Sequence, residues 1–331
     1  MTCLHALKHR SAALALFALI LSTTFAAPRR PNVLWLLADD LKPTIHSYGD
    51  PIAKTPNIDR LAARGVSFDL AYCNQAVCAP SRNNLMLGSR STSIGIYNLG
   101  TNFRVAVPDA VTVTQWFMRH GYRAEGLGKI MHTGHGNVDD AASWSVPHYK
   151  EPVVEYIVPA SKPDGRLTRE EAFFTNTKTG PNKSLPRGAA WEAPDVLDNA
   201  YGDGRLAEEA IRRLRAAKDK PDQPFFLAVG FARPHLPFCV PKKYWDLYDR
   251  DAFPLTENPL PPEGAPAYAG KTLGELNQYF PIPEKPPLDD DLQRHVIHGY
   301  YASVSFTDAQ IGKVLDALDE LGLADNTIIV L

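Results

Sequence analysis

The residues best placed to do chemistry lie in one short segment, residues 75–88, where Cys78 precedes Ser81 by three positions and Arg82 by four. Pro80 between them suits the first turn of a helix, because its missing N–H would have no partner there. Cys78 would then lie at the helix N-terminus, where free backbone N–H groups favour an anion. Arg82 follows one turn later and can bind an oxyanion through two hydrogen bonds. The pattern indicates an anion-handling nucleophile; the alternative is a buried structural cysteine beside a surface arginine.

Two adjacent acids follow the first predicted strand. Residues 32–38 form a continuous apolar run, which is typical of a parallel strand buried on both faces, and the run ends at Asp39 and Asp40. Ligands of open α/β sheets gather beyond the carboxyl ends of the strands, so these carboxylates are candidates for binding a hard cation. The alternative interpretation is a helix cap or a turn.

Two further predicted strands are followed by basic residues. A strand over 121–127 precedes Lys129 and His132, and a buried strand over 225–231 precedes His235, which stands between two prolines. The proline rings restrict the backbone on both sides of His235, as suits a preorganised catalytic group. Singly, each residue could be an ordinary surface or turn residue. Their shared position after strands is where the chemistry of α/β sheets is expected.

The remaining pattern is that of an α/β protein, with helices indicated by apolar spacing and strands by apolar runs. The expected helices cover residues 55–63, 112–120, 205–217 and 290–321, and the further expected strands cover 66–71 and 327–331, the last of them buried. Gly299 is a candidate break in the last helix. This alternation favours a mostly parallel central sheet flanked by helices, with long irregular loops over 133–200 and 254–287.

The composition fits a large folded domain. The chain has 331 residues, 44% of them hydrophobic, and a net charge of −2, which is ample for a sizeable core. No basic run stands out, which argues against nucleic acid as the main partner. The mature chain keeps Cys73, Cys78 and Cys239, so at least one thiol is expected to be free or modified. A disulfide between Cys73 and Cys78 is compatible with their spacing.

The N-terminus is predicted to be a signal peptide over residues 1–26. It has a basic start at residues 8–10, an apolar run over 11–21 and a small-residue cleavage site at 24–26. An uncleaved membrane anchor is the alternative, but the run is too short to span a bilayer comfortably. We therefore expect an exported protein, periplasmic or secreted, or lysosomal in a eukaryote, with no stable membrane anchor.

In order and approximate spacing, the candidate site residues resemble those of the type I sulfatases, a family within the alkaline phosphatase superfamily. The resemblance rests on Cys78-Ala79-Pro80-Ser81-Arg82 with Leu85 and Gly88, on Asp39-Asp40, on Gly128-Lys129 with His132, and on Arg233-Pro234-His235. Leu87 departs from the pattern, because threonine is common before the motif glycine. The resemblance implies an alkaline phosphatase-like sulfatase fold, of which residues 27–331 would be the N-terminal portion, with the C-terminal part missing.

The resemblance also implies a modified nucleophile and a metal. In that family a maturation enzyme oxidises the motif cysteine, here Cys78, to formylglycine. One hydroxyl of the aldehyde hydrate attacks sulfur to form a covalent sulfate ester, and the second hydroxyl later expels sulfate. Carried over to this sequence, Asp39, Asp40 and residue 78 would bind Ca²⁺, for which oxygen ligands are suitable.

The same resemblance gives roles to the basic residues. Arg82 would clamp the hydroxyl of residue 78 and anchor the metal's carboxylates, and Lys129 would bind sulfate. His132 would take a proton from the second hydroxyl during sulfate release, and His235 would contact sulfate and help the leaving alcohol.

The function implied is hydrolysis of sulfate esters on a sulfated glycan, with a uronate 2-O-sulfate as the expected substrate. The alternatives are a phosphate or phosphonate ester hydrolase of the same superfamily, and a non-catalytic protein that binds sulfated glycans. The family's remaining metal ligands, an Asp followed by His or Asn, and a further catalytic lysine are expected after Leu331. Residues 1–331 alone are therefore expected to be inactive or nearly so, because two carboxylates and residue 78 leave calcium under-coordinated.

Overall fold

The computed structural model describes residues 29–177, 184–259, 262–269 and 273–331. The predicted signal peptide, residues 1–26, lies outside the described residues. All helices and strands discussed below belong to the unit formed by residues 32–331. Within the described part of the chain, no helix is long and apolar enough to cross a membrane.

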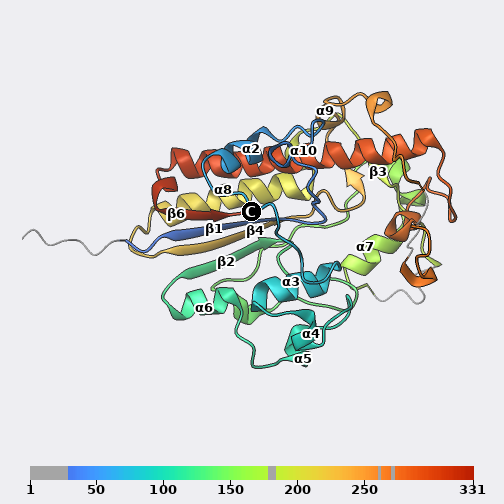
Figure 1. Cartoon of the computed structure of the whole chain (residues 1–331). Coiled ribbons are helices and arrows are strands. Elements are labelled where there is room, and N and C mark those ends of the chain that lie inside the picture. The colour runs from blue at the N-terminus through green and yellow to red at the C-terminus, as the bar shows by residue number, and fades with distance from the viewer. Residues whose placement is uncertain (1–28, 178–183, 260–261, 270–272) are drawn as a thin grey trace, which may run out of the picture. The chain divides into compact units, whose positions relative to one another are not determined.

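Four parallel strands form the central sheet, in the order β2-β4-β1-β6 (Figure 1). The strands are β1 (Asn32–Ala38), β2 (Arg123–Gly128), β4 (Phe225–Phe231) and β6 (Thr327–Val330). Each of the two central strands is a continuous apolar run with a neighbour on both sides, as parallel strands between helical layers require. The prediction of a mostly parallel sheet is confirmed.

Helices cover both faces of the sheet, with α2, α8 and α10 on one side and α3 and α6 on the other (Figure 1). Their bounds are Pro56–Ala63 for α2, Cys78–Leu87 for α3, Val113–Arg119 for α6, Gly202–Lys218 for α8 and Asp290–Glu320 for α10. Successive residues of β1 point to opposite faces, so Leu34 packs in the core with Leu206 and Ile311, whereas Trp35 packs with Met86.

The shorter elements lie mostly in the connections. They are α4 (Ser91–Ile94), α5 (Phe103–Ala106), α7 (Arg169–Phe174), α9 (Lys242–Trp245), the paired strands β3 (Trp191–Glu192) and β5 (Phe238–Cys239), and 3₁₀ turns that include η9 (Gly274–Gln278). The segment 133–200 is thus less irregular than predicted, because α7 forms within it behind a capping box made by Thr168 and Glu171.

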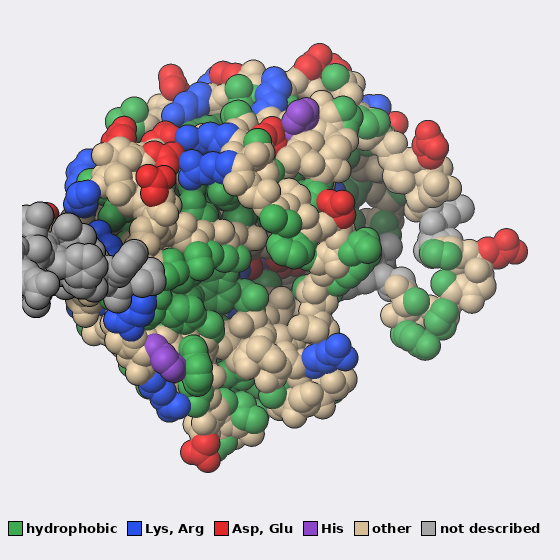
Figure 2. All heavy atoms as spheres, turned by 60° about the vertical axis from the view of Figure 1, so that its left-hand side comes forward, with side chains coloured by type: hydrophobic (Ala, Val, Ile, Leu, Met, Phe, Trp, Pro, Cys, Tyr) green, Lys and Arg blue, Asp and Glu red, His purple; other side chains and the backbone are tan. Residues whose placement is uncertain are grey.

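Two strand predictions need correction. Residues 66–71 form no strand, and Val66 and Phe68 are 79% and 70% exposed, because no other described strand pairs with this segment. Among the described strands β6 pairs with β1 alone, and Ile328 and Val330 on one of its faces are 51% and 45% exposed, where a buried strand was predicted. Figure 2 turns the left-hand side of Figure 1 toward the viewer. It shows hydrophobic side chains gathered at the surface of this face.

Gly299 does not interrupt the last helix, which runs unbroken through it. A Cβ at this position would lie 2.8 Å from the ring of Phe238 and 3.0 Å from that of Trp245. The glycine therefore lets α10 approach these aromatic side chains closely, which is a packing role and not a break.

Candidate active site

The first strand carries two adjacent acids to the carboxyl edge of the sheet. The backbone N–H of Asp39 donates to the carbonyl of Phe231 at 3.2 Å, which extends the pairing of β1 with β4. Asp40 has a φ of 56°, a left-handed conformation that turns the chain, and its carbonyl accepts a hydrogen bond from the Tyr300 hydroxyl at 2.8 Å. As a result the Asp39 side chain is 4% exposed and that of Asp40 is 49% exposed.

Arg82 and Lys129 form a buried ion-pair network with Asp39. Arg82 donates from Nη2 to Asp39 Oδ1 at 2.5 Å and from Nη1 to the carbonyls of Lys129 and Ile130. Lys129, directly after β2, pairs its Nζ with Asp39 Oδ2. Burial raises the pKa of Asp39, but the two cations outweigh it and hold that pKa far below its usual range. Arg82 therefore pairs with an acid of the site. Its sequence position alone suggested a fork for an oxyanion, and the family resemblance gave it the further role of anchoring the metal's carboxylates.

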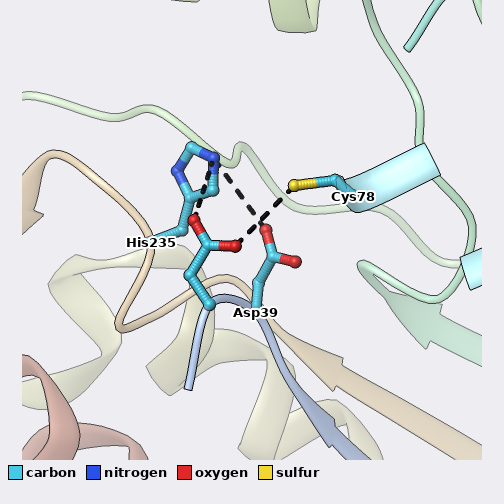
Figure 3. Close-up of side chains that lie close together, drawn as sticks. Asp39, Cys78 and His235 are labelled. Atoms are coloured by element: carbon cyan, nitrogen blue, oxygen red, sulfur yellow. Dashed lines mark hydrogen bonds and ion pairs between the residues drawn. The ribbon is translucent and has the colours of Figure 1, made fainter. Parts of the chain in front are cut away.

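Cys78 begins α3, and its Sγ lies 3.8 Å from Asp40 Oδ1 (Figure 3). The sequence indicates a residue that favours an anion, but the structure contradicts this for the thiol. Burial, and then the charge of Asp39, raise the pKa of Cys78 to about 12 despite the helix N-terminus. The thiol is therefore protonated near neutral pH. Cys73, Cys78 and Cys239 are all free, so the disulfide that spacing allowed is not formed.

His235 follows β4, and its ring points toward the acids (Figure 3). Its Nδ1–H donates to the carbonyl of Leu236 at 2.5 Å. Nε2 then faces the acids, 4.0 Å from Asp39 Oδ2 and 3.9 Å from Asp40 Oδ2. Burial, and then Lys129, lower the pKa of His235 to about 3. The ring is thus neutral near pH 7, with Nε2 as a proton acceptor.

Phe174, the last residue of α7, lies among the basic side chains. Its ring centroid is 5.5 Å from that of His235, 6.0 Å from that of His132 and 4.7 Å from Lys129 Nζ. His132 is 3% exposed, and its Nε2 lies 3.2 Å from His135 Nδ1. Within the described structure, His132 Nδ1 has no hydrogen-bond partner. Burial, and then Lys129, lower the pKa of His132 to about 3.

The structure thus brings the seven residues singled out from the sequence to one edge of the sheet. Four of them, Asp39, Asp40, Cys78 and His235, have potential ligand atoms that all lie within 4.8 Å of one another. Arg82 and Lys129 are joined to this group through Asp39. His132 is linked to it less directly, through the ring of Phe174.

The arrangement has counterparts in known proteins, because residues 31–331 match the family model for sulfatases. The chain belongs to the sulfatase family. It is 36% identical to iduronate 2-sulfatase of Homo sapiens over 318 residues, which are 90% of this chain and 53% of that protein. It is 31% identical to a sulfatase of Formosa agariphila over 321 residues, 91% of this chain and 58% of that protein. The family predicted from the sequence is confirmed.

Solved structures agree with the sulfatase fold. The phosphonate monoester hydrolase of Agrobacterium radiobacter matches with a TM-score of 0.61 at 21% sequence identity, over 91% of this chain and 61% of that chain. A putative sulfatase from Bacteroides fragilis matches with a TM-score of 0.54 at 22% identity, over 93% of this chain and 62% of that chain. These similarities confirm the predicted fold class. The chain spans about half the length of the curated relatives it matches.

The acids of this sulfatase-family chain fit a divalent cation. Asp39 and Asp40 offer carboxylate oxygens, which hard cations such as Ca²⁺ prefer. Burial, and then the charge of Asp39, raise the pKa of Asp40, so a cation held by both carboxylates would relieve their repulsion. The sulfur of Cys78 is a soft ligand, and an oxygen at that position would suit Ca²⁺ better. The donor set is therefore compatible with calcium and improves if residue 78 is modified.

Two acids beside the site were not found from the sequence. Glu275 in η9 places Oε1 3.7 Å from His235 Nε2, and burial raises its pKa to about 7. Glu170 in α7 is 4% exposed, and burial raises its pKa to about 8. Both lie in segments predicted to be irregular. A signal for α7 existed, because Thr168 followed by Glu171 three residues later is a capping-box pattern.

Proposed function

We propose that this protein hydrolyses sulfate esters on a sulfated glycan, with a uronate 2-O-sulfate as the substrate. The observation that carries the proposal is the convergence of Cys78, the adjacent acids Asp39 and Asp40, and the buried cations of Arg82 and Lys129 at one edge of the sheet. The choice of substrate is supported by the 36% identity to a relative named iduronate 2-sulfatase.

In this proposal residue 78 acts after conversion of Cys78 to formylglycine by a maturation enzyme, and the aldehyde hydrate supplies the nucleophilic oxygen. The unmodified cysteine is poorly suited to attack, because a thiol with a pKa of about 12 provides little thiolate at neutral pH. The positive end of the α3 dipole favours a negative charge on oxygen at residue 78, whereas burial and Asp39 oppose it, so such a charge would depend on the cation proposed below.

Each basic residue has a distinct part in the proposal. Lys129 offers its ammonium group to a sulfate oxygen, and Arg82 keeps Asp39 ionised and oriented. His235 Nε2 faces carboxyl groups, and an anionic sulfate group beside it would favour its protonation, so that it can give a proton to the leaving alcohol. His132 Nδ1 is left without a protein partner and would take a proton from the hydroxyl of residue 78.

The cation we propose is Ca²⁺, held by Asp39, Asp40 and residue 78. Bound there, calcium would lower the pKa of a coordinated hydroxyl group and neutralise charge on the sulfate. Calcium takes six to eight oxygen ligands, more than these three residues supply. We therefore propose that further ligands follow Leu331 in a longer protein, and that residues 1–331 alone turn over sulfate esters near the background rate.

The targeting and domain predictions belong to the same proposal. We propose that residues 1–26 are a signal peptide and that residues 27–331 are the N-terminal portion of a sulfatase catalytic domain. Export to the periplasm or out of the cell, or to a lysosome in a eukaryote, would bring such an enzyme to sulfated glycans. Mass spectrometry of the N-terminus of the protein purified from its host checks the cleavage site.

A competition assay tests the proposed reaction. The protein is co-expressed with a formylglycine-generating enzyme, both as residues 27–331 and as the longer product if the reading frame continues past Leu331. Conversion of Cys78 is measured by mass spectrometry. A uronate 2-sulfate disaccharide, an arylsulfate and a phosphonate monoester then compete in the presence of calcium. We expect sulfate release from the disaccharide by the longer product, abolished by chelation with EGTA and by Cys78→Ala.

The other outcomes identify the alternatives. Preferred cleavage of the phosphonate monoester would assign the protein to the phosphate and phosphonate hydrolases of its superfamily. Equal binding of the disaccharide by the wild type and by Cys78→Ala, without turnover by either, would make it a glycan-binding protein. Full turnover by residues 27–331 alone would contradict the ligand count given above.

A further inference from the structure

The loop that follows Lys129 contains a tight turn with His135 at a central position. The backbone conformation of the turn does not explain why this residue is a histidine. The N–H of Asn137 donates to the carbonyl of Gly134 at 2.8 Å, and the N–H of Gly134 donates to the carbonyl of Asn137 at 3.1 Å. The two central residues, His135 and Gly136, have φ values of 54° and 86°. Such two-residue turns with positive φ favour Asn-Gly at these positions. Asparagine would serve the turn better than histidine, so the imidazole calls for another explanation.

The turn is fixed against α7. The N–H of His135 donates to the carbonyl of Phe173 at 3.0 Å, and a Cβ on Gly134 would lie 2.8 Å from the same oxygen. The imidazole of His135 stacks on the Phe173 ring at 4.7 Å with an interplanar angle of 13°, and it meets the Phe174 ring edge-on at 5.6 Å. The orientation of the imidazole is therefore determined by packing.

The oriented ring meets a residue of the active site. His135 Nδ1 lies 3.2 Å from His132 Nε2, so these two atoms share one hydrogen bond. His132 is 3% exposed, and its Nδ1 has no hydrogen-bond partner among the described residues, while His135 is only partly buried. The pair thus connects a buried nitrogen that has no hydrogen-bond partner among the described residues with a residue that is partly exposed.

We propose that His135 is a positioning and relay residue for His132, which holds His132 in the Nε2–H tautomer and carries its proton to solvent. This inference rests on the proposed function, in which His132 is a base. The Nε2–H of His132 donates to His135 Nδ1, and this leaves the lone pair of His132 Nδ1 free for the reacting hydroxyl group. The contact of the imidazole with His132 explains why this turn carries a histidine at position 135, where asparagine would suit the backbone.

The proton movements balance within the pair. The hydroxyl of residue 78 gives its proton to His132 Nδ1, and the proton on His132 Nε2 passes to His135 Nδ1. His135 releases its own Nε2 proton to water, so both rings remain neutral. To restore the first tautomers, His132 Nδ1 gives its proton to water that enters the site after sulfate has left, the Nδ1 proton of His135 passes back to His132 Nε2, and water returns a proton to His135 Nε2. No oxidant or other co-reactant is needed.

The charges around His132 explain why a relay is useful. Burial, then Lys129, and then His135 lower the pKa of His132, while Asp39 acts in the opposite direction and Arg82 lowers it further. Burial and Lys129 also lower the pKa of His135. The doubly protonated form of His132 is therefore disfavoured near neutral pH, and the contact with His135 offers a route by which a proton can leave from Nε2.

Two substitutions that both suit the turn separate positioning from relay. His135→Asn places an amide oxygen near the position of Nδ1, so it can still accept from His132 but cannot pass a proton on. His135→Gly removes the acceptor as well. His120→Asn, at an exposed position at the end of α6, controls for the loss of one imidazole.

The first measurement needs no turnover. In residues 27–331 labelled with ¹⁵N-histidine, the ring nitrogen shifts of His132, assigned with His132→Gln, report its tautomer. We expect the Nε2–H tautomer in the wild type, in His120→Asn and in His135→Asn, and a mixture of tautomers in His135→Gly. An unchanged tautomer in His135→Gly would overturn the positioning role whether or not the chain is an enzyme.

The second measurement uses whichever form of the protein turns over an arylsulfate. We expect His135→Asn and His135→Gly to release the alcohol in a burst at the wild-type rate and then to release sulfate about tenfold more slowly. Added imidazole should restore part of the rate in His135→Gly. Sulfate release at the wild-type rate in His135→Asn would overturn the relay. If no form turns over sulfate esters while the tautomer depends on His135, the proposed function fails and the relay falls with it, but the contact between the histidines stands.

Discussion

Two sides of the active site are built in different ways. The ion-paired wall, consisting of Asp39, Arg82 and Lys129, has side chains that are at most 7% exposed, and its two cations share one carboxylate at short range. The loop wall, consisting of Glu170, Phe174 and Glu275, comes from α7 and η9. Its acids carry pKa values raised to about 8 for Glu170 and about 7 for Glu275, because burial disfavours their charged forms.

The difference shows what each wall can do. On the ion-paired wall the loss of any one charge would leave a buried charge without its partner. The ion pairs therefore hold these side chains in place. On the loop wall the acids can gain or lose protons near neutral pH, and Phe174 contacts three basic side chains through its ring alone. In the proposed function, the first wall would hold the cation and sulfate in a fixed arrangement, and the second would take part in proton transfer.

The largest expected effect is on stability when the ion-paired wall loses its acid. Asp39→Asn leaves Arg82 and Lys129 buried without their shared carboxylate, and we expect the free energy of unfolding to fall by about 3–5 kcal/mol. Asp40→Asn is the matched control at the adjacent, half-exposed position, with an expected change within about 0.5 kcal/mol. Urea unfolding of residues 27–331 measures both. Equal losses in the two variants would remove the distinction between these neighbours.

The same pair of variants gives a sign for the pH dependence. The pKa of Asp39 is depressed in the folded state, so its ion pairs stabilise the fold above the ordinary carboxyl pKa of 3.8 and are lost as pH falls below it. We expect the free energy of unfolding of the wild type to decline with falling pH in that acidic range. In Asp39→Asn the free energy of unfolding should decline less than in the wild type over this range. In Asp40→Asn the decline should not be smaller than in the wild type.

The second prediction concerns the Cys78 thiol, which lies beside Asp40. Because burial raises the pKa of Cys78 to about 12, we expect iodoacetamide at pH 8 to alkylate unconverted Cys78 about 100-fold more slowly than the exposed Cys73. Peptide mass spectrometry over a time course gives both rates within one sample. Alkylation in urea is the control, where the two thiols should react alike. A fast reaction of folded Cys78 would restore the thiolate that the sequence suggested.

The third prediction tests how the loop wall is held. Thr168→Ala removes the capping box of α7, and Thr112→Ala removes the corresponding capping box of α6, which lies away from the site. Each should lower the free energy of unfolding by about 1 kcal/mol. In whichever form of the protein turns over an arylsulfate, only Thr168→Ala should also slow that turnover, by a few-fold, because α7 carries Phe174. An equal effect of both on turnover would mean that general stability, and not α7, is responsible.

The smallest expected effect concerns Glu275 of the loop wall and the pH dependence of the free energy of unfolding. The pKa of Glu275 is raised from 4.5 to about 7, so the fold loses stability as pH rises through this window, because only the unfolded state ionises freely. Glu275→Gln should flatten that loss by less than about 1 kcal/mol, because the side chain is 41% exposed and screened by solvent. Unfolding is measured at pH 4.5 and pH 8 with EGTA present. A steeper decline in Glu275→Gln would contradict the raised pKa.

The sequence alone predicted the core strands of the sheet and the residues of the ion-paired wall. The apolar runs that form β1 and β4 are long enough to be recognised, whereas β2 carries Arg123 and Glu125 and is less apolar. The side chains that follow the three strands meet because parallel strands share one carboxyl edge. The strand expected at residues 66–71 was wrong, because apolar alternation shows that a segment can pair but not that a partner is present.

The tertiary structure decided what no local pattern contains. The protonation of Cys78 depends on burial and on Asp39, which is distant in sequence, and these outweigh the helix N-terminus that the sequence does reveal. Glu275 and Phe174 reach the site from η9 and α7, whose positions are set by tertiary packing. The sequence thus determined the family, the fold class and the candidate site residues that the sheet brings together. Only the fold determined their charges and neighbours, because electrostatic interaction depends on distance and burial, which are properties of the folded chain.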